Sequence, residues 1–199
     1  MSAAAAETAA WSVVPLDGER WDGFADLVER NNGIFGGCWC IGWHPECGQR
    51  GISHRDVKEQ LVRDGRAQAA LVLDPGGAVQ GWCQYGPPEE LPGIKHRRAY
   101  AKEPPPHPDW RIACLYVDRR HRGQGVARVA LGGALELVAR AGGGLVEAIS
   151  EVTAGREAHG RFLFSGTAEL LEDHGFVRVR QVGLHAWILN RTVEPSKES

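Results

Sequence analysis

Residues 112–127 of the 199-residue chain read Ile-Ala-Cys-Leu-Tyr-Val-Asp-Arg-Arg-His-Arg-Gly-Gln-Gly-Val-Ala, and this stretch decides the fold. Its first six residues form an apolar run typical of a buried strand. Its last residues open an amphipathic stretch that reaches about residue 141. A strand, a glycine-containing turn and a helix in this order leave backbone N–H groups free to bind an anion. The sequence therefore predicts an anion-binding turn at residues 122–127.

The charges around this turn point the same way. Four basic residues in a row, Arg119, Arg120, His121 and Arg122, stand at the start of the predicted helix. The helix dipole disfavours cations at this end, and a helix without a ligand there is expected to begin with Asp, Ser or Thr followed by acidic residues. A negatively charged ligand would relieve the repulsion.

The composition indicates one globular domain. Hydrophobic residues make up 43% of the chain and charged residues 24%, and the net charge of −2 gives no general attraction to nucleic acid or to acidic membranes. We expect a flexible leader at residues 1–10, one domain at 11–190 and a polar tail at 191–199. The five cysteines come without a signal peptide or a long apolar segment, which predicts a cytoplasmic protein with reduced thiols.

Strand and helix signals alternate along the chain. Asp17 is placed to cap a helix with apolar positions Trp21, Phe24, Ala25 and Val28, and Ser53 is placed to cap a second helix. Residues 86–109 hold seven of the eleven prolines and predict a long irregular loop. Strands are predicted at 11–16, 69–73, 78–85, 112–117, 145–150, 176–181 and 185–190, with a short helix at 167–174. This order indicates an α/β or α+β fold with a mixed sheet.

Two common phosphate-binding motifs do not fit the turn. A P-loop needs Lys and Ser or Thr after its last glycine, where this chain has Ala127-Arg128. A dinucleotide-binding fingerprint needs a third glycine at Arg128. The remaining pattern, Arg122-x-x-Gly125-x-Ala127, resembles the coenzyme A loop of the GNAT N-acetyltransferase superfamily. A plain tight turn between strand and helix is the alternative.

Other segments carry the same resemblance. Leu115-Tyr-Val117 is similar to the family's fourth strand, and Leu170-Leu-Glu-Asp-His-Gly-Phe176 is similar to its closing helix. The segments Gly36-Gly-Cys-Trp-Cys40 and Phe164-Ser-Gly-Thr167 look like the CWC and FxGT landmarks of one bacterial branch. The resemblance implies a GNAT-like mixed central sheet of about six to seven strands flanked by helices.

The resemblance also implies an activity. Members of the family transfer an acetyl group from acetyl-CoA to an amine, and we expect direct transfer in a ternary complex. The acceptor would be a small-molecule or peptide amine, with no metal, no nucleic acid and no membrane involved, and a homodimer is a possible assembly. The implied coenzyme A contacts are Leu115, Tyr116, Val117, Arg122, Gly123, Gln124, Gly125, Val126 and Ala127, with Ser165 and Thr167 as further candidates.

The chemistry calls for a base. An amine with a pKa near ~10 is less than ~1% free base at pH 7, so a group that accepts its proton is expected. We favour Glu147, with an outward carboxylate on a half-exposed strand as the alternative interpretation. Weaker candidates are Glu151, Glu89 and Glu90.

An acid for the leaving thiolate is not evident. Many members of the family have a tyrosine four residues before the glycine of the closing Gly-Phe, and this chain has Leu171 there. Possible substitutes are Tyr116, Ser165 and Thr167, although Thr167 also suits a helix cap.

Four soft ligands lie close together at Cys38, Cys40, His44 and Cys47. They are compatible with a zinc site, with buried thiols that act as small apolar residues, and with a covalent acetyl-cysteine. The aromatic residues of this segment, Phe35, Trp39 and Trp43, predict either a wall of the acceptor pocket or plain core.

Two other classes of function compete with the enzyme. The first is a non-catalytic acyl-CoA-binding or regulatory module on the same fold, suggested by Leu171. The second is a nucleic-acid binder that uses the basic residues between Arg119 and Arg128, which the overall charge disfavours.

Overall fold

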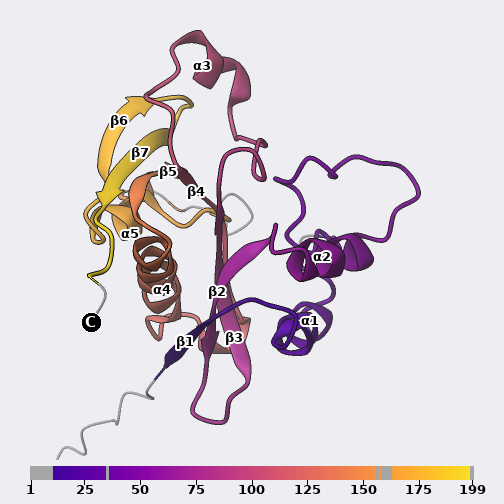
Figure 1. Ribbon diagram of the computed structural model, residues 1–199. Helices are drawn as coiled ribbons and strands as arrows, with labels where there is room; N and C mark the ends of the chain where they lie inside the picture. Colours follow the sequence, from indigo (N-terminus) through magenta and orange to yellow (C-terminus); the bar gives the residue numbers. More distant parts are fainter. Residues whose placement is uncertain (1–10, 35, 156, 158–162, 198–199) are drawn as a thin grey trace, which may run out of the picture.

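The computed structural model describes residues 11–197 apart from positions 35, 156 and 158–162. The predicted leader at residues 1–10 lies outside the described residues. A single seven-stranded sheet, in the order β1-β2-β3-β4-β5-β7-β6, runs through the middle of the molecule (Figure 1). Its strands are β1 (Ser12–Pro15), β2 (Gln68–Leu73), β3 (Val79–Gly86), β4 (Trp110–Val117), β5 (Gly144–Glu151), β6 (Val177–Gln181) and β7 (Ala186–Val193). All neighbouring strands are antiparallel except β4 and β5, so the prediction of a mixed sheet is confirmed.

Helices cover both faces of the sheet. Helices α1 (Trp21–Glu29) and α2 (His54–Arg63) lie on one side, and α4 (Val126–Arg140) and α5 (Ala168–Glu172) lie on the other (Figure 1). A short 3-10 helix, η1 (Arg119–His121), precedes α4. The segment predicted as an irregular loop contains a further helix, α3 (Arg97–Lys102). It was missed because it has only six residues, begins with two arginines, and follows His96, which is not a typical N-cap residue and makes no capping hydrogen bond.

Each face has its own core. The apolar positions predicted for the first helix, including Trp21, Phe24 and Val28, are buried against β3 and β4. On the opposite face α4 packs closely on β3. A Cβ atom at Gly81 would lie 2.7 Å from the Tyr116 carbonyl oxygen and 3.0 Å from Val126, so only glycine fits under the start of α4.

Two of the three predicted helix caps are present. The side chain of Ser53 accepts a hydrogen bond from the Asp56 N–H, and Thr167 accepts one from the Leu170 N–H. The prediction for Asp17 is wrong: α1 begins after Arg20, and Asp17 instead accepts a bond from the Arg20 N–H in the turn before the helix. Among the described helices, none combines the length and apolar character needed to span a bilayer.

The middle of the sheet opens where β4 and β5 part. They pair only at Trp110 with Val146, Arg111 with Glu147 and Ile112 with Ala148. Just beyond, Ala113 has no partner on β3, which is the mark of a β-bulge. The segment 164–167 lies in the opening, and it contacts both strands. In the gap between the diverging strands, backbone groups of β4 are therefore not paired with β5, and one of them binds segment 164–167 instead.

Candidate functional site

The predicted anion-binding turn has the backbone conformation that the prediction requires. Gly123 and Gly125 both have left-handed backbone angles, with φ of 76° and 81°. No atom of the residues that the structure describes lies within 4 Å of the position that a Cβ atom would take at either glycine, so this side of the turn is open. Gly125 is the N-cap of α4, and no side chain of the described residues caps this helix.

The turn holds a run of unpaired donors. Within the part of the chain that the structure describes, no hydrogen-bond acceptor is found for any backbone N–H from Arg122 to Arg128. The first N–H groups of a helix normally bond to water, to a cap or to a ligand. Together with the positive end of the helix dipole, these donors make an anion site.

The basic residues around the turn divide into two groups. Arg120 is bound to Asp118 and Arg128 to Asp173, so their charges are compensated. Arg119 and Arg122 make no ion pair with any described acidic residue, and both are exposed. The turn therefore keeps positive charge available beside its free N–H groups.

A buried carboxylate fixes the base of the turn. Asp118 directly follows β4, is 1% exposed, and accepts hydrogen bonds from Arg30, Asn31 and Arg120. The hydrogen bond from Arg120 is the main reason why the pKa of Asp118 is lowered well below its usual value, against the opposing effect of burial. Arg30 and Asn31 follow α1, so this residue connects the turn to the helix on the other face of the sheet.

The predicted thioester contact on β4 already has a partner. The Leu115 N–H points into the gap between β4 and β5 and donates a 2.5 Å hydrogen bond to the Phe164 carbonyl oxygen. Ser165 continues this segment along β5, where its hydroxyl donates to the Ile149 carbonyl oxygen at 2.6 Å. Thr167 serves as the cap of α5. Ser165 and Thr167 were the further candidates for contact with coenzyme A. Ser165 lies at the gap between β4 and β5, whereas Thr167 has a structural role.

A small cavity of about 30 Å³ opens beside this gap. Arg111 and Ala113 of β4 and Glu147 and Ile149 of β5 form its floor, and Trp43, Lys95 and Phe164 contribute to its walls. The Trp43 and Phe164 rings lie 5.1 Å apart, and the Lys95 ammonium lies 5.3 Å from the Phe164 ring centre. Of the aromatic residues predicted as acceptor-pocket wall or core, Trp39 is buried in the core, and Trp43 lines this cavity and also packs against the core.

Glu147 lies at the floor of this cavity and is fully buried. The alternative interpretation, an outward carboxylate on a half-exposed strand, is therefore wrong, because the loop that carries α3 covers this part of β5. Its carboxylate accepts hydrogen bonds from Arg111 Nε at 3.1 Å and from the Tyr100 hydroxyl at 2.9 and 3.2 Å. Burial, and then the Glu147 charge, raise the pKa of Tyr100.

The sequence did not identify Arg111, Tyr100 or Lys95 as site residues. Arg111 sits opposite Glu147 in the β4–β5 register, and Tyr100 reaches it from α3. A charged residue inside an otherwise apolar strand was the only available signal for Arg111. No local pattern links residue 100 with residue 147, so tertiary structure alone brings Tyr100 to the site.

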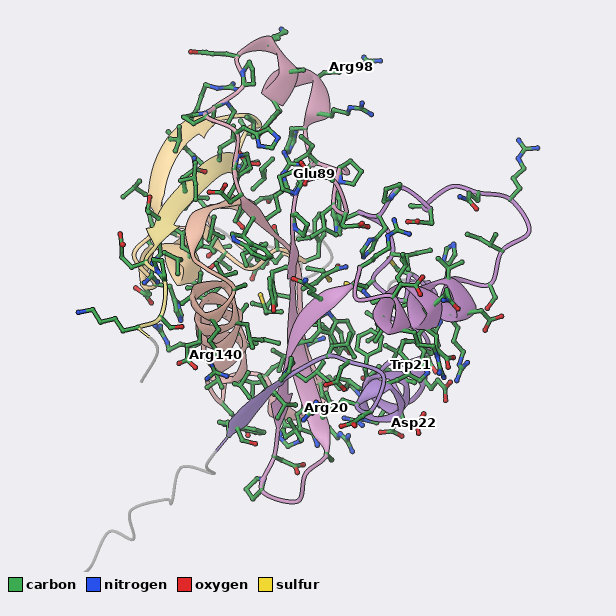
Figure 2. The ribbon with its side chains drawn as sticks, in the orientation of Figure 1. Arg20, Trp21, Asp22, Glu89, Arg98 and Arg140 are labelled. Carbon is green, nitrogen blue, oxygen red and sulfur yellow. The ribbon has the colours of Figure 1, made fainter. Side chains whose placement is uncertain are left out.

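Two of the weaker candidate bases form ion pairs, as Glu147 does with Arg111. Glu151 forms an ion pair with Lys95, and Glu90 forms one with Arg66 at 2.8 Å. Glu89 lies on the loop after β3, below Arg98 of α3 (Figure 2), and lines an outer cavity of about 470 Å³. Arg111 borders both the outer and the inner cavity.

Two of the positions considered for the acid that protonates the leaving thiolate lie away from the inner cavity: Leu171, where many relatives have a tyrosine, and Tyr116. Leu171 is 1% exposed in the core, as an apolar residue should be. Tyr116 is buried and stacked on Trp82 at 4.9 Å, and burial raises its pKa. Tyr116 packs on the α1 face and is not among the residues that line the inner cavity.

The four soft ligands of the connection between α1 and α2 do not converge. Cys40 and His44 are buried and both contact Gln84, Cys38 is half-buried, and Cys47 is exposed. Among the described residues no three His, Cys, Asp or Glu side chains are placed to share a metal ion. Phe35 lies outside the described residues.

Comparison with known families identifies the class of protein. Residues 42–163 match the model of the acetyltransferase (GNAT) family. The match covers more than half of the chain, and the chain therefore belongs to the GNAT acetyltransferase family. Enzymes of this family use acetyl-CoA and act on small-molecule or peptide acceptors. A search among curated proteins gave no match.

Solved structures agree on the fold. The chain is similar to an arylalkylamine N-acetyltransferase-like protein from mosquito, with a TM-score of 0.56, 10% identity and coverage of 92% of this chain and 100% of the other. It is also similar to a protein from Corynebacterium glutamicum described as histone acetyltransferase HPA2 and related acetyltransferase, with a TM-score of 0.53, 17% identity and coverage of 95% and 98%. At these identities the likeness extends to the fold only.

Proposed function

We propose that this protein transfers an acetyl group from acetyl-CoA directly to an amine whose nitrogen reaches the cavity beside β4 and β5. The observation that carries the proposal is the turn at residues 122–127. Its backbone N–H groups have no acceptor among the described residues, it opens α4, and Arg119 and Arg122 add charge without an acidic partner. A diphosphate is the anion that matches such a long row of donors.

The gap between β4 and β5 is proposed to hold the acyl end of the donor. The Leu115 N–H points into this gap, and the Phe164 carbonyl oxygen that it binds would give way to an oxygen of the thioester. A backbone N–H aimed at that oxygen stabilises the negative charge that develops on it during transfer. Tyr116 and Val117 then continue the strand toward the turn.

Glu147 is proposed to take the proton from the amine. It is the carboxylate on the cavity floor, and the cavity walls of Trp43 and Phe164 suit the apolar part of an amine. Arg111 and Tyr100 hold the carboxylate by hydrogen bonds, so its position is fixed before the acceptor arrives. The acceptor itself is a primary amine small enough to reach a floor between two strands, carried by a small molecule or a peptide end.

One observation favours the non-catalytic alternative. The position at which many relatives have a tyrosine acid is Leu171, buried in the core. In that case the protein would bind acyl-CoA without transferring the acyl group.

A transfer assay distinguishes the two functions. The protein is incubated with acetyl-CoA and a panel of polyamines, amino acids and peptides, and the release of free coenzyme A thiol is measured together with the mass of each amine. Acetylation of at least one amine, lost in Glu147→Gln, supports the enzyme. Binding of acetyl-CoA by calorimetry with no amine acetylated supports the binding module.

A further inference from the structure

The buried face beneath α2 contains a cluster of reactive groups that acetyl transfer does not use. Cys40, from the connection between α1 and α2, and Cys114, from β4, are each 5% exposed, and Lys58 of α2 is 1% exposed. Cys40 and Cys114 belong to the same buried cluster, and both lie beside Gln84: the Cys40 thiol donates to its side-chain oxygen, and Cys114 is its partner in the β3–β4 register. The cluster therefore joins the wall of the acceptor cavity to the central strand.

Cys40 is held in place by an unusual backbone. Trp39 and Cys40 both have left-handed angles, with φ of 48° and 55°. Such angles are costly for residues other than glycine and persist where the surrounding structure requires them. They direct the Cys40 sulfur to the Gln84 side-chain oxygen at 2.8 Å, and Gln84 faces Cys114 in the β3–β4 register.

Lys58 supplies a charge that the fold leaves without a hydrogen bond. Its ammonium is buried and has no acceptor among the described residues, and its nearest aromatic neighbour is the Phe24 ring at 5.8 Å. Burial lowers the pKa of Lys58, and the surrounding thiols Cys40, Cys114 and Cys38 act in the opposite direction. An unpartnered cation beside three thiols stabilises a thiolate among them.

The pKa values of Cys40 and Cys114 are shifted in opposite directions. Burial raises the pKa of Cys40, but the hydrogen bond from Cys114 and the charge of Lys58 outweigh it and lower the pKa. The hydrogen bond to Cys40, and then burial, raise the pKa of Cys114 well above its usual value. These opposite directions favour ionisation of Cys40 over ionisation of Cys114.

We propose that Cys40 and Cys114 form a redox-active pair that a small hydroperoxide oxidises to a disulfide, with Lys58 stabilising the attacking Cys40 sulfur. The Cys40 thiolate attacks one oxygen of hydrogen peroxide, which breaks the O–O bond, forms a sulfenic acid and releases hydroxide. The Cys114 thiol then attacks that sulfur, an S–S bond forms, and the sulfenic oxygen leaves as water. Overall, two thiols and one hydrogen peroxide give one disulfide and two waters.

The consequence lies at the cavity. The bond would tie the connection that carries Trp43 to β4, the strand that carries Arg111 and Ala113. Oxidation would therefore restrict the wall of the acceptor site. The proposal does not depend on the identity of the acceptor, because the bond is detected by mass alone.

The test is peptide mapping of the full-length protein after treatment with hydrogen peroxide at a few equivalents. The expected result is a 2 Da loss, a crosslinked pair of peptides that contain Cys40 and Cys114, and full reversal by dithiothreitol. In Cys114→Ser the reaction should stop at a sulfenic acid on Cys40 that dimedone traps. Lys58→Met should slow the oxidation at least tenfold.

The chain contains matched controls. Cys83→Ser alters a buried thiol on the opposite face of β3, and Cys47→Ser alters an exposed one, and neither should change the product. Crosslinks that involve Cys38 or Cys47 in place of Cys114, no loss of mass, or an unchanged rate in Lys58→Met would overturn the proposal. Mapping of the wild-type protein decides between these outcomes even if a variant fails to fold.

Discussion

The turn at residues 122–127 and the connection at residues 34–51 differ in how their polar groups are satisfied. The turn is largely exposed, it takes left-handed angles at two glycines, Gly123 and Gly125, and its N–H groups find no partner among the described residues. The connection buries Cys40 and His44 against Gln84 and uses left-handed angles at residues that resist them. The turn therefore offers its N–H groups to a ligand, whereas the polar side chains of the connection form their hydrogen bonds within the protein.

This difference predicts where mutations act. Changes at the turn should affect the binding of acetyl-CoA and leave stability nearly intact, and changes in the connection should affect stability or the acceptor. The cavity with Glu147 at its floor lies between strands, and changes there should affect turnover instead.

Glu147→Gln should lower turnover by about 10² or more, because a positioned general base contributes roughly 10²–10⁴ in rate. The pH optimum should also move upward, since the acceptor must then lose its proton to solvent. The measurement is the pH profile of kcat, with acetyl-CoA affinity measured by calorimetry as the control. Unchanged kinetics would remove Glu147 from the mechanism.

Asp118→Asn should reduce the free energy of unfolding by about 2 kcal/mol, because it removes the charge of a buried carboxylate whose arginine partners, Arg30 and Arg120, keep contact with solvent. The pKa of Asp118 is lowered in the folded state, mainly by the hydrogen bond from Arg120. Its contribution is therefore fully present above the unfolded value near ~3.9 and is lost as the pH falls below that value. Urea unfolding at pH 7 and at pH 3 checks this, and an equal difference between wild type and variant at both pH values would contradict it.

His44 should make the free energy of unfolding depend on pH in a range above the one in which Asp118 acts. Burial, followed by the charges of Lys58 and Arg66, lowers the pKa of His44 to about 3. The unfolded chain binds a proton near pH ~6.5, so stability should fall by up to about 1.4 kcal/mol per pH unit between 6.5 and 3.

The matched variant is His44→Gln, which keeps a hydrogen-bond acceptor for Gln84 and does not titrate. It should flatten the stability profile between pH 6 and pH 4 without altering the loss below pH 4 that Asp118 causes. A profile identical to that of the wild type would show that the connection does not depend on a neutral histidine.

Trp43→Ala should raise the KM for the acceptor about tenfold, because it removes an aromatic wall of the inner cavity. The affinity for acetyl-CoA should stay unchanged. Arg122→Ala is the matched variant on the turn and should produce the reverse pattern. If both variants change the same constant, the two regions do not serve different substrates.

The contrast between the turn and the connection also explains which features were predictable from the sequence. The turn is a local motif, so the spacing of Arg122, Gly125 and Ala127 was enough to predict it together with its strand and helix. The caps at Ser53 and Thr167 are local as well, and both predictions are confirmed.

The parts that could not be predicted depend on contacts between distant residues. Tyr100 reaches Glu147 from a helix that has no capping signal, and Arg111 meets Glu147 only through strand register. The segment at Phe164 enters the gap between β4 and β5 only after the sheet has formed. The placement of Cys40 likewise depends on backbone angles that its residue type does not favour.

Calorimetric titration of acetyl-CoA into the wild-type protein and into three glycine variants tests the central claim most directly. Gly125→Glu should abolish measurable binding, because it places a negative charge where the diphosphate would lie. Gly125→Asn, which tolerates the left-handed angle without adding charge, should retain most of the affinity, and Gly65→Glu should retain all of it, since Gly65 has a similar angle of 70° at the end of α2. Wild-type affinity in Gly125→Glu would contradict the account.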